Sequence, residues 1–345
     1  MFKKRSSKNV VVGLELDPTH IAAAEVAVDG RLSVKRGASA PLRPGILRDG
    51  EVADPAALTD ALKAFFDEHG FPTRVRLGIA NQRIVARTID LPPLSDQKAL
   101  ATAVRVQAPD HVPMPMEEAV LDFQPLGVVE TPQGPRARVA IVAVRREMVQ
   151  RLAEAVMDAG LRVEGIDLSA FAMVRALDAP VESDAELYVN VAGLVNVAVA
   201  NASGVVFTRA AAGGLGATAV ALSERRSLTL EHAAQWMRHV GLAAPLESIE
   251  GDPDVVAVTR ELLEEGVNEV ADTVRNTLNF YRMQEGAEAV SGAVLCGPAA
   301  QLDGFAERLG DLLRLPLRVG AVQDADGAPD AMLTVAAGLA LEDRA

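Results

Sequence analysis

The sequence has little cysteine, few aromatic residues, no excess of positive charge and no long apolar run. Its one cysteine, Cys296, cannot form a disulfide within the chain, which favours a reducing cytoplasm. Aromatic residues make up only 3% of the chain, so its cores must pack aliphatic side chains. The formal net charge of −13 argues against a nucleic-acid-binding face. No apolar run reaches the roughly 20 residues of a membrane-spanning helix, so we expect none.

The side-chain clusters that hold metal ions or carry nucleophilic catalysis are also missing from the sequence. Cys296 lies in an apolar segment with no histidine nearby, and we interpret it as a buried small hydrophobe. We interpret Glu15 as a solvated or hydrogen-bonded carboxylate at a strand end rather than a metal ligand. Metal-ligand spacing is absent among the five histidines, so we predict no metal site: His20, His69, His111, His232 and His239.

What the sequence does contain is one pattern of short β-branched runs, used twice. Runs of this kind, bounded by glycine-containing turns, predict three antiparallel strands joined by tight turns. They occur at Leu187–Val191, Val195–Ala200 and Val205–Arg209, and again at Val10–Leu16, Ile21–Val28 and Arg31–Ala38. The length of 345 residues also suits two domains. The sequence therefore predicts a duplicated two-domain α/β fold with a cleft between the copies.

Three short turns are expected to face that cleft, at Asp17–His20, Ala192–Asn196 and Gly297–Ala300. The backbone N–H groups of such turns can converge on a phosphate oxygen, and glycine permits the close approach. Each turn taken alone is more often an ordinary tight turn. Three of them on a duplicated frame favour a phosphate-binding cleft.

Six segments in a fixed order resemble the PilM family of type IV pilus assembly proteins, which is related to FtsA within the actin-like ATPase superfamily. The resemblance covers nearly the whole chain, and its order is more specific than any one segment. The segments begin at Arg87 and end near the C-terminus: RTIDLPPLSDQKALATAVRVQA with HVPMPMEEAVLDFQPL, VAIVAVRREMVQRLAEAVMDAGLRVEGIDLSAFAMVRAL, GVVFTRAAAGGLG, EVADTVRNTLNFYRMQ, VLCGPAAQLDGFAERLGDLLRLPLRVG and TVAAGLAL.

This resemblance implies a duplicated actin-like (ribonuclease H-like) two-domain α/β fold with a small inserted α+β subdomain. Residues 1–74 and 138–182 would form the first actin-like domain, and residues 75–137 would be the inserted subdomain. Residues 183–345 would form the second actin-like domain, with a helical subdomain around 217–290.

The first phosphate loop departs from the family pattern. It is GLELDPTHIA, residues 13–22, where the pattern is roughly G-I-D-I-G-S-S-S-V-K. Asp17 stands in place of a glycine that must approach phosphate, and Pro18 lacks an N–H donor. Glu15 replaces the acid that holds the metal-bound water, and Ala22 replaces a phosphate-binding lysine. A carboxylate at position 17 would repel a triphosphate.

The other nucleotide-binding segments depart from the pattern as well. Asn190 replaces an acid, Ala234 and Met237 stand where the pattern has the Glu and Lys that contact base and ribose, and the adenosine loop is Gly297-Pro298-Ala299. Phosphoryl transfer needs Mg²⁺ and positioned donors, so we predict no ATP hydrolysis and no tight nucleotide binding. The resemblance leaves a vestigial nucleotide cleft formed by Asp17, Thr19, His20, Gly193, Asn196, Gly214 and Gly297.

By resemblance, the protein binds the cytoplasmic N-terminal tail of a PilN-like inner-membrane protein. The groove would lie between the first domain and residues 75–137, and this partner would recruit the protein to the inner face of the cytoplasmic membrane. The basic residues Lys3, Lys4 and Arg5 would add weak attraction to anionic lipid, and no signal-type apolar core follows them. Self-association stays open.

Two alternatives remain open at this point. One is a working ATPase that binds Mg-ATP through an unusual phosphate loop. The other is an FtsA-like cell-division protein, against which the polar end EDRA counts, because FtsA-type proteins would need an amphipathic membrane helix there.

Overall fold

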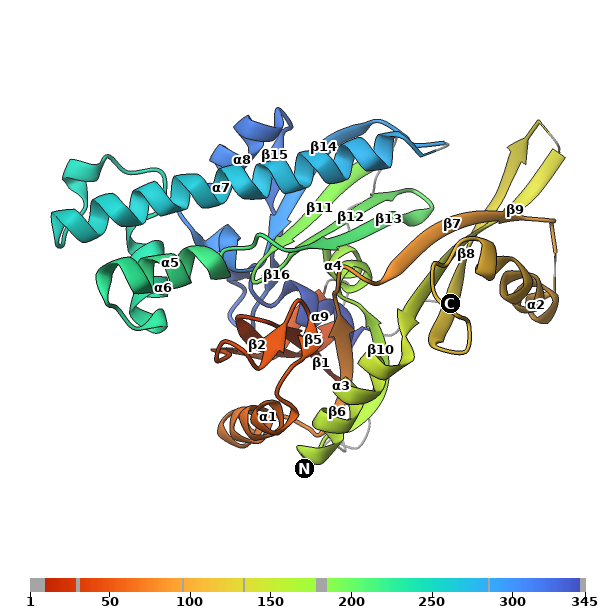
Figure 1. Ribbon diagram of the computed structural model, residues 1–345, viewed down its shortest axis with the longest axis horizontal. Coiled ribbons are helices and arrows are strands. Elements are labelled where there is room, and N and C mark those ends of the chain that lie inside the picture. Colours follow the sequence, from red (N-terminus) through yellow and green to blue (C-terminus); the bar gives the residue numbers. More distant parts are fainter. Residues whose placement is uncertain are drawn as a thin grey trace, which may run out of the picture.

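The computed structural model describes residues 10–28, 32–94, 96–132, 134–177, 185–284 and 286–341. Figure 1 shows two α/β halves with a small sheet projecting from one of them. Four sequence predictions lie outside the described residues. They concern the basic residues 1–9, the Asp29-Gly30 turn with the strand start at Arg31, the domain boundary at 182/183, and the polar end 342–345.

The first half is built on a seven-stranded sheet in the order β10-β6-β1-β2-β3-β16-β17. Strands β1, β2 and β3 are consecutive and antiparallel, whereas β6 and β10 lie parallel to β1 on its other side. The strands are β1 (Val12–Asp17), β2 (His20–Val28), β3 (Leu32–Pro41), β6 (Arg74–Ile79), β10 (Arg162–Leu168), β16 (Val322–Gln323) and β17 (Pro329–Asp330). A two-stranded hairpin, β4 (Leu47–Arg48) and β5 (Glu51–Val52), precedes α1 (Pro55–His69). Helices α1 and α3 (Arg146–Asp158) contribute apolar residues to the main core of this half.

The second half repeats this arrangement in a five-stranded sheet with the order β13-β12-β11-β14-β15. Its first three strands are again an antiparallel group, and β14 and β15 run parallel to β11. The strands are β11 (Ala185–Val191), β12 (Val195–Asn201), β13 (Gly204–Ala211), β14 (Val290–Cys296) and β15 (Leu317–Val319). The order β3-β2-β1-β6-β10 in the first half matches it strand for strand, so the predicted duplication is confirmed.

Helices cover the second sheet with a largely aliphatic core. The longest, α7, has 30 residues and lies across the sheet in Figure 1. Its buried residues, among them Val267, Val270 and Val274, recur at helical spacing. The helices are α5 (Gly216–Arg226), α6 (Leu230–Val240), η3 (Leu246–Ser248), α7 (Pro253–Arg282), η4 (Pro298–Gln301) and α8 (Phe305–Leu313). Within the described ranges, none of the helices is both long enough and apolar enough to cross a membrane.

Two short helices cross over between the halves. Helix α4 (Ser169–Leu177) follows the last parallel strand of the first sheet, yet Ala172 and Met173 pack with residues of the second sheet. Helix α9 (Thr334–Ala340) comes after the last strand of the second sheet, β15, by way of β16 and β17. Its Ala336 and Ala337 pack with residues of the first sheet. The helices approach so closely that a Cβ on Gly338 would lie 1.8 Å from the backbone oxygen of Ala172. Each half is therefore completed by chain from the other.

The inserted subdomain is a three-stranded sheet, in the order β7-β9-β8, with one helix. It comprises β7 (Val85–Leu91), α2 (Gln97–Gln107), η2 (Ala108–Asp110), β8 (Ala119–Thr131) and β9 (Gly134–Arg145). The predicted bounds of 75–137 are therefore wrong at both ends. Strand β6 lies between β10 and β1 in the main sheet, and β9 continues to Arg145. The segment RVRLGI is predicted as a strand from the sequence, but its pattern does not show which sheet the strand joins.

Candidate functional site

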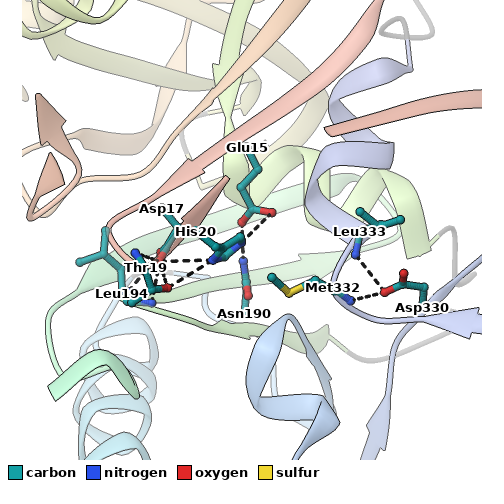
Figure 2. Close-up of polar contacts among 10 residues, drawn as sticks. Glu15, Asp17, Thr19, His20, Asn190, Leu194, Asp330, Met332 and Leu333 are labelled. Carbon is teal, nitrogen blue, oxygen red and sulfur yellow. Dashed lines mark hydrogen bonds and ion pairs between the residues drawn. The ribbon is translucent and has the colours of Figure 1, made fainter. Parts of the chain in front are cut away.

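The two halves meet where their first hairpins face each other. The turn between β1 and β2 carries Asp17, and the turn between β11 and β12 carries Gly193 and Leu194. The Gly193 N–H donates to Asp17 Oδ1 at 2.8 Å, and the Leu194 N–H donates to Asp17 Oδ2 at 3.3 Å. Figure 2 shows this carboxylate pointing out of its own hairpin and onto the other.

Thr19 adds two more donors to the same carboxylate. Its backbone N–H and its hydroxyl donate to Asp17 Oδ1 at 2.9 and 2.5 Å. An aspartate that accepts from the residue two positions ahead is a common way to shape a turn. Here the same oxygen also binds the facing hairpin, so the local turn and the contact between the halves share one side chain.

Three polar side chains extend the contact away from the turn. His20 Nδ1 lies 3.5 Å from Asp17 Oδ1, and His20 Nε2 lies 3.8 Å from Glu15 Oε2. The Asn190 amide donates to Glu15 Oε1 at 3.0 Å. All four residues are at most 7% exposed. Glu15 is thus a hydrogen-bonded carboxylate near a strand end, as the sequence predicts, and it is deeply buried.

The charges in this cluster set the pKa values of its members. Burial alone would lower the pKa of His20, but the carboxylates of Asp17 and Glu15 outweigh burial and raise it to about 10. Burial alone would raise the pKa of Asp17, but His20 and the Thr19 donors outweigh it and lower the pKa below its ordinary value. At neutral pH the cluster is therefore a buried imidazolium beside a buried carboxylate.

The seven residues predicted for the vestigial nucleotide cleft gather in this one region. Contacts join Asp17, Thr19, His20 and Gly193 directly. A Cβ on Gly214 would lie 2.1 Å from the oxygen of Ala192, and one on Gly297 would lie 1.9 Å from Asn190 Oδ1. Asn196 is buried opposite Asn190 in the β11–β12 ladder. Their proximity was predicted, and their role toward a nucleotide stays a prediction.

These residues do not fit a bound nucleotide phosphate. The N–H groups of Gly193 and Leu194, which could face phosphate oxygens, already donate to Asp17. Pro18 has no N–H to offer. The methyl group of Thr19 lies 3.0 Å from where a Cβ of Gly216 would stand, so protein atoms fill the space between the turns. Within the part of the chain that the structure describes, no group of three His, Cys, Asp or Glu side chains could hold a metal ion.

Sequence reasoning missed the roles of two residues here. His20 was grouped with the cleft, but its role as a buried cation between two acids was not foreseen. Its position directly across the hairpin from Asp17 is the signal that could have shown it. Asp330 accepts from the N–H groups of Met332 and Leu333 at 2.8 and 3.3 Å and so shapes the entry to α9 (Figure 2). Its position just before a helical segment was the available signal.

Cys296 is buried, and burial raises the pKa of its thiol well above the ordinary value, as expected of a structural cysteine.

A second feature is a groove of about 1460 Å³ between the inserted subdomain and the first half. One face of the β7-β9-β8 sheet packs on α2 through residues such as Val139 and Ile141. Alternation places the next residues of β9 on the other face. Ala140, Val142 and Val144 line the groove there.

The opposite wall of the groove comes from β10, α3 and α4. Ile166, Leu168 and Phe171 line it, together with the ion-paired Asp167 and Arg175. Strand β8 contributes Val120 and the exposed Asp122, and it forms an edge of its sheet. Groove residues are thus apolar along the floor and charged at a few places.

Comparison with known proteins places this architecture in a family. A family model described as "Type IV pilus assembly protein PilM" matches residues 13–324. A chain of a solved PilM-PilN type IV pilus biogenesis complex is similar, with TM-score 0.75 and 25% identity over 96% of this chain and 97% of that chain.

Two more distant structures share the fold. EutJ, an ethanolamine utilization protein from Carboxydothermus hydrogenoformans, has TM-score 0.55 and 14% identity, over 97% of this chain and 90% of that chain. MreB5 of Spiroplasma citri bound to ADP has TM-score 0.55 and 14% identity, over 96% of this chain and 95% of that chain. The predicted duplicated actin-like fold is confirmed by these likenesses. Because the family model spans nearly the whole sequence, this chain belongs to the PilM family of type IV pilus assembly proteins.

Proposed function

We propose that this protein is an adaptor of a type IV pilus machine that holds the cytoplasmic tail of a PilN-like inner-membrane protein. The observation that carries the proposal is the groove between the inserted subdomain and the first half. The similar PilM chain was solved in a complex with PilN, which supports the same class of partner here. Such a partner would hold the protein at the inner face of the cytoplasmic membrane.

The groove suits an extended apolar segment. The sheet face of Ala140, Val142 and Val144 meets Ile166 and Phe171 across the groove, so apolar side chains of a peptide would be enclosed on two sides. The free edge of β8 could also pair with an extended backbone. Both features favour a strand-like tail over a helix.

Charge favours a tail of this origin. Cytoplasmic segments next to membrane spans carry an excess of Lys and Arg. The protein carries a net charge of −13, and Asp122 places an exposed carboxylate at the groove. A basic tail with a few apolar anchors would therefore complement the groove in both shape and charge.

A charge placed on the groove floor should weaken tail binding. In Val142→Asp, a carboxylate would have to be buried against the apolar anchors of the tail, so we expect the Kd for the tail peptide to rise at least tenfold, about 1.4 kcal/mol. The measurement is isothermal titration with the synthetic N-terminal segment of the PilN-type protein from the same organism. Val106→Asp is the matched control, since Val106 is 72% exposed on α2, on the other side of the subdomain. Equal Kd values for Val142→Asp and Val106→Asp would contradict binding of the tail in the groove.

We further propose that the protein acts without hydrolysing ATP. Asp17 takes the backbone donors of the facing hairpin, and the phosphate loop lacks the N–H of residue 18. The alternative of a working ATPase would require this contact to open for nucleotide. The match to the PilM family also directs the proposal away from an FtsA-like division role.

Nucleotide binding is testable by thermal unfolding. A ligand that binds only the native state at 100 times its Kd stabilises it by about 2.7 kcal/mol. We expect millimolar Mg-ATP and Mg-ADP to leave the melting temperature where MgCl₂ at equal ionic strength leaves it. A saturable rise with either nucleotide would instead favour the ATPase alternative.

A further inference from the structure

The hairpins between the halves form an oxyanion site whose ligand is part of the chain. We propose that the Asp17 carboxylate is a built-in substitute for a bound phosphate-type anion and holds the two halves closed without any ligand. The contact is called the latch below and comprises Asp17, Thr19, Gly193 and Leu194. No latch residue lines the tail groove, so the latch and tail binding can fail independently of each other.

The donor set is that of an anion site. Successive backbone N–H groups at a turn form a concave site for anions, and Gly193 and Leu194 provide two such groups. The N–H and hydroxyl of Thr19 complete a set of four donors around one carboxylate. A Cβ at position 193 would lie 2.6 Å from Asp17 Oδ1, so the glycine is needed for this approach.

The latch joins parts of the chain that no local structure would bring together. Asp17 and Gly193 are 176 positions apart, and each lies at the end of the first hairpin of its own half. The Glu15–Asn190 hydrogen bond repeats the connection beside it. Opening the cleft would therefore leave at least the Gly193 and Leu194 N–H groups without their acceptor until water or another anion replaced it.

The latch needs no charged side chain from the second half to compensate the Asp17 carboxylate. His20 lies between Asp17 and Glu15 and compensates part of their negative charge from within the first half. The latch residues of the second half contribute only backbone N–H groups to it. The second hairpin therefore presents donors alone, and any oxyanion of suitable size could in principle satisfy them once Asp17 is gone.

Hydrogen–deuterium exchange of Asp17 variants tests the latch. In Asp17→Asn an NH₂ group must face at least one of the donors, and in Asp17→Gly the acceptor is lost. We expect peptides that contain Gly193 and Leu194 to exchange at least tenfold faster in both variants than in the wild type. Asp67→Asn, on the exposed face of α1, is the control and should leave these peptides unchanged. Unchanged protection in Asp17→Asn would overturn the latch, even if Asp17→Gly failed to fold.

Anion rescue separates an oxyanion site from simple loss of packing. Inorganic phosphate should raise the melting temperature of Asp17→Gly saturably and slow exchange at Gly193 and Leu194. Chloride at equal ionic strength should do neither, and the wild type should not respond, because Asp17 already fills the site. If phosphate stabilised the wild type as much as Asp17→Gly, or left Asp17→Gly unchanged, the substitution of carboxylate for phosphate would be wrong. Neither result depends on tail binding, which is measured separately.

Discussion

Replacing His20 by glutamine is expected to lower the free energy of unfolding by roughly 3 to 5 kcal/mol. The substitution removes the cation that lies between Glu15 and Asp17, two buried carboxylates. Breaking a buried ion pair by removing one partner is costly because the other charge stays out of water. The measurement is urea unfolding at neutral pH. His232→Gln, at an exposed position on α6, should change stability by less than about 0.5 kcal/mol.

The pH dependence of the free energy of unfolding tests whether the loss of stability in His20→Gln comes from the charge on His20. The folded pKa of His20 is about 10 against an ordinary 6.5, so its stabilising contribution is complete below pH 6.5 and is lost as the pH rises through about 10. Asp17 has a lowered pKa, so its contribution is present above its ordinary value of 3.8 and is lost as the pH falls through the lowered value. The stability difference between wild type and His20→Gln should therefore shrink from pH 6.5 to 10.

A double variant tests the pairing itself. The double variant carries both Glu15→Gln and His20→Gln. Because the Glu15 charge is gone as well, it leaves fewer uncompensated buried charges than His20→Gln alone. The two single losses should therefore exceed the loss in the double variant by at least about 0.5 kcal/mol. Strict additivity, or a His20→Gln variant as stable as the wild type, would mean that His20 is buried without acting as the counter-ion.

Replacing Gly338 by alanine should destabilise the protein by about 3 kcal/mol, although alanine is the better helix former. In an unconstrained helix this change gains roughly 0.8 to 1.0 kcal/mol. Here the new methyl would lie 1.8 Å from the backbone oxygen of Ala172, and neither backbone can yield without separating α4 from α9. A loss of stability in Gly338→Ala would therefore show that the close packing of α4 on α9 outweighs the helix propensity of alanine, and a gain would show the reverse.

Gly292→Ala in β14 is the matched control for that substitution. Its added Cβ would meet no atom closer than 3.5 Å, and the φ of Gly292 lies outside the left-handed region. We expect this variant to be within about 1 kcal/mol of the wild type. Thermal unfolding of both variants gives the comparison. A stabilised Gly338→Ala would show that the two helices can move apart at little cost.

The repeated strand groups could be predicted from the sequence because their signals are local. Short β-branched runs that end in Gly193 or Ser203-Gly204 specify strands and turns without reference to the rest of the chain. Helix α6 begins after the N-cap Thr229 and ends at Gly241, and these two signals are local in the same sense. Two copies of the same local pattern then imply the duplicated fold.

The edge of the inserted subdomain could not be predicted in this way. Whether β6 pairs with β1 or with β7 depends on which strand lies beside it, and its sequence is compatible with either. The role of Asp17 depends on residues still farther away in the sequence. Its charge predicts repulsion of a phosphate, but only the fold brings it within 2.8 Å of the N–H of Gly193, in the other half.

The exchange of helices between the halves has a consequence for synthesis on the ribosome. Domains commonly fold in the order in which they are made. Here the first sheet stays uncovered on the face that α9 occupies, and lacks β16 and β17, until almost every other described element has been made. A nascent chain that stalls before Thr334 would therefore expose Ala22 and Ala24 of the first sheet. The half of the protein that is synthesised first is thus the last to complete its core.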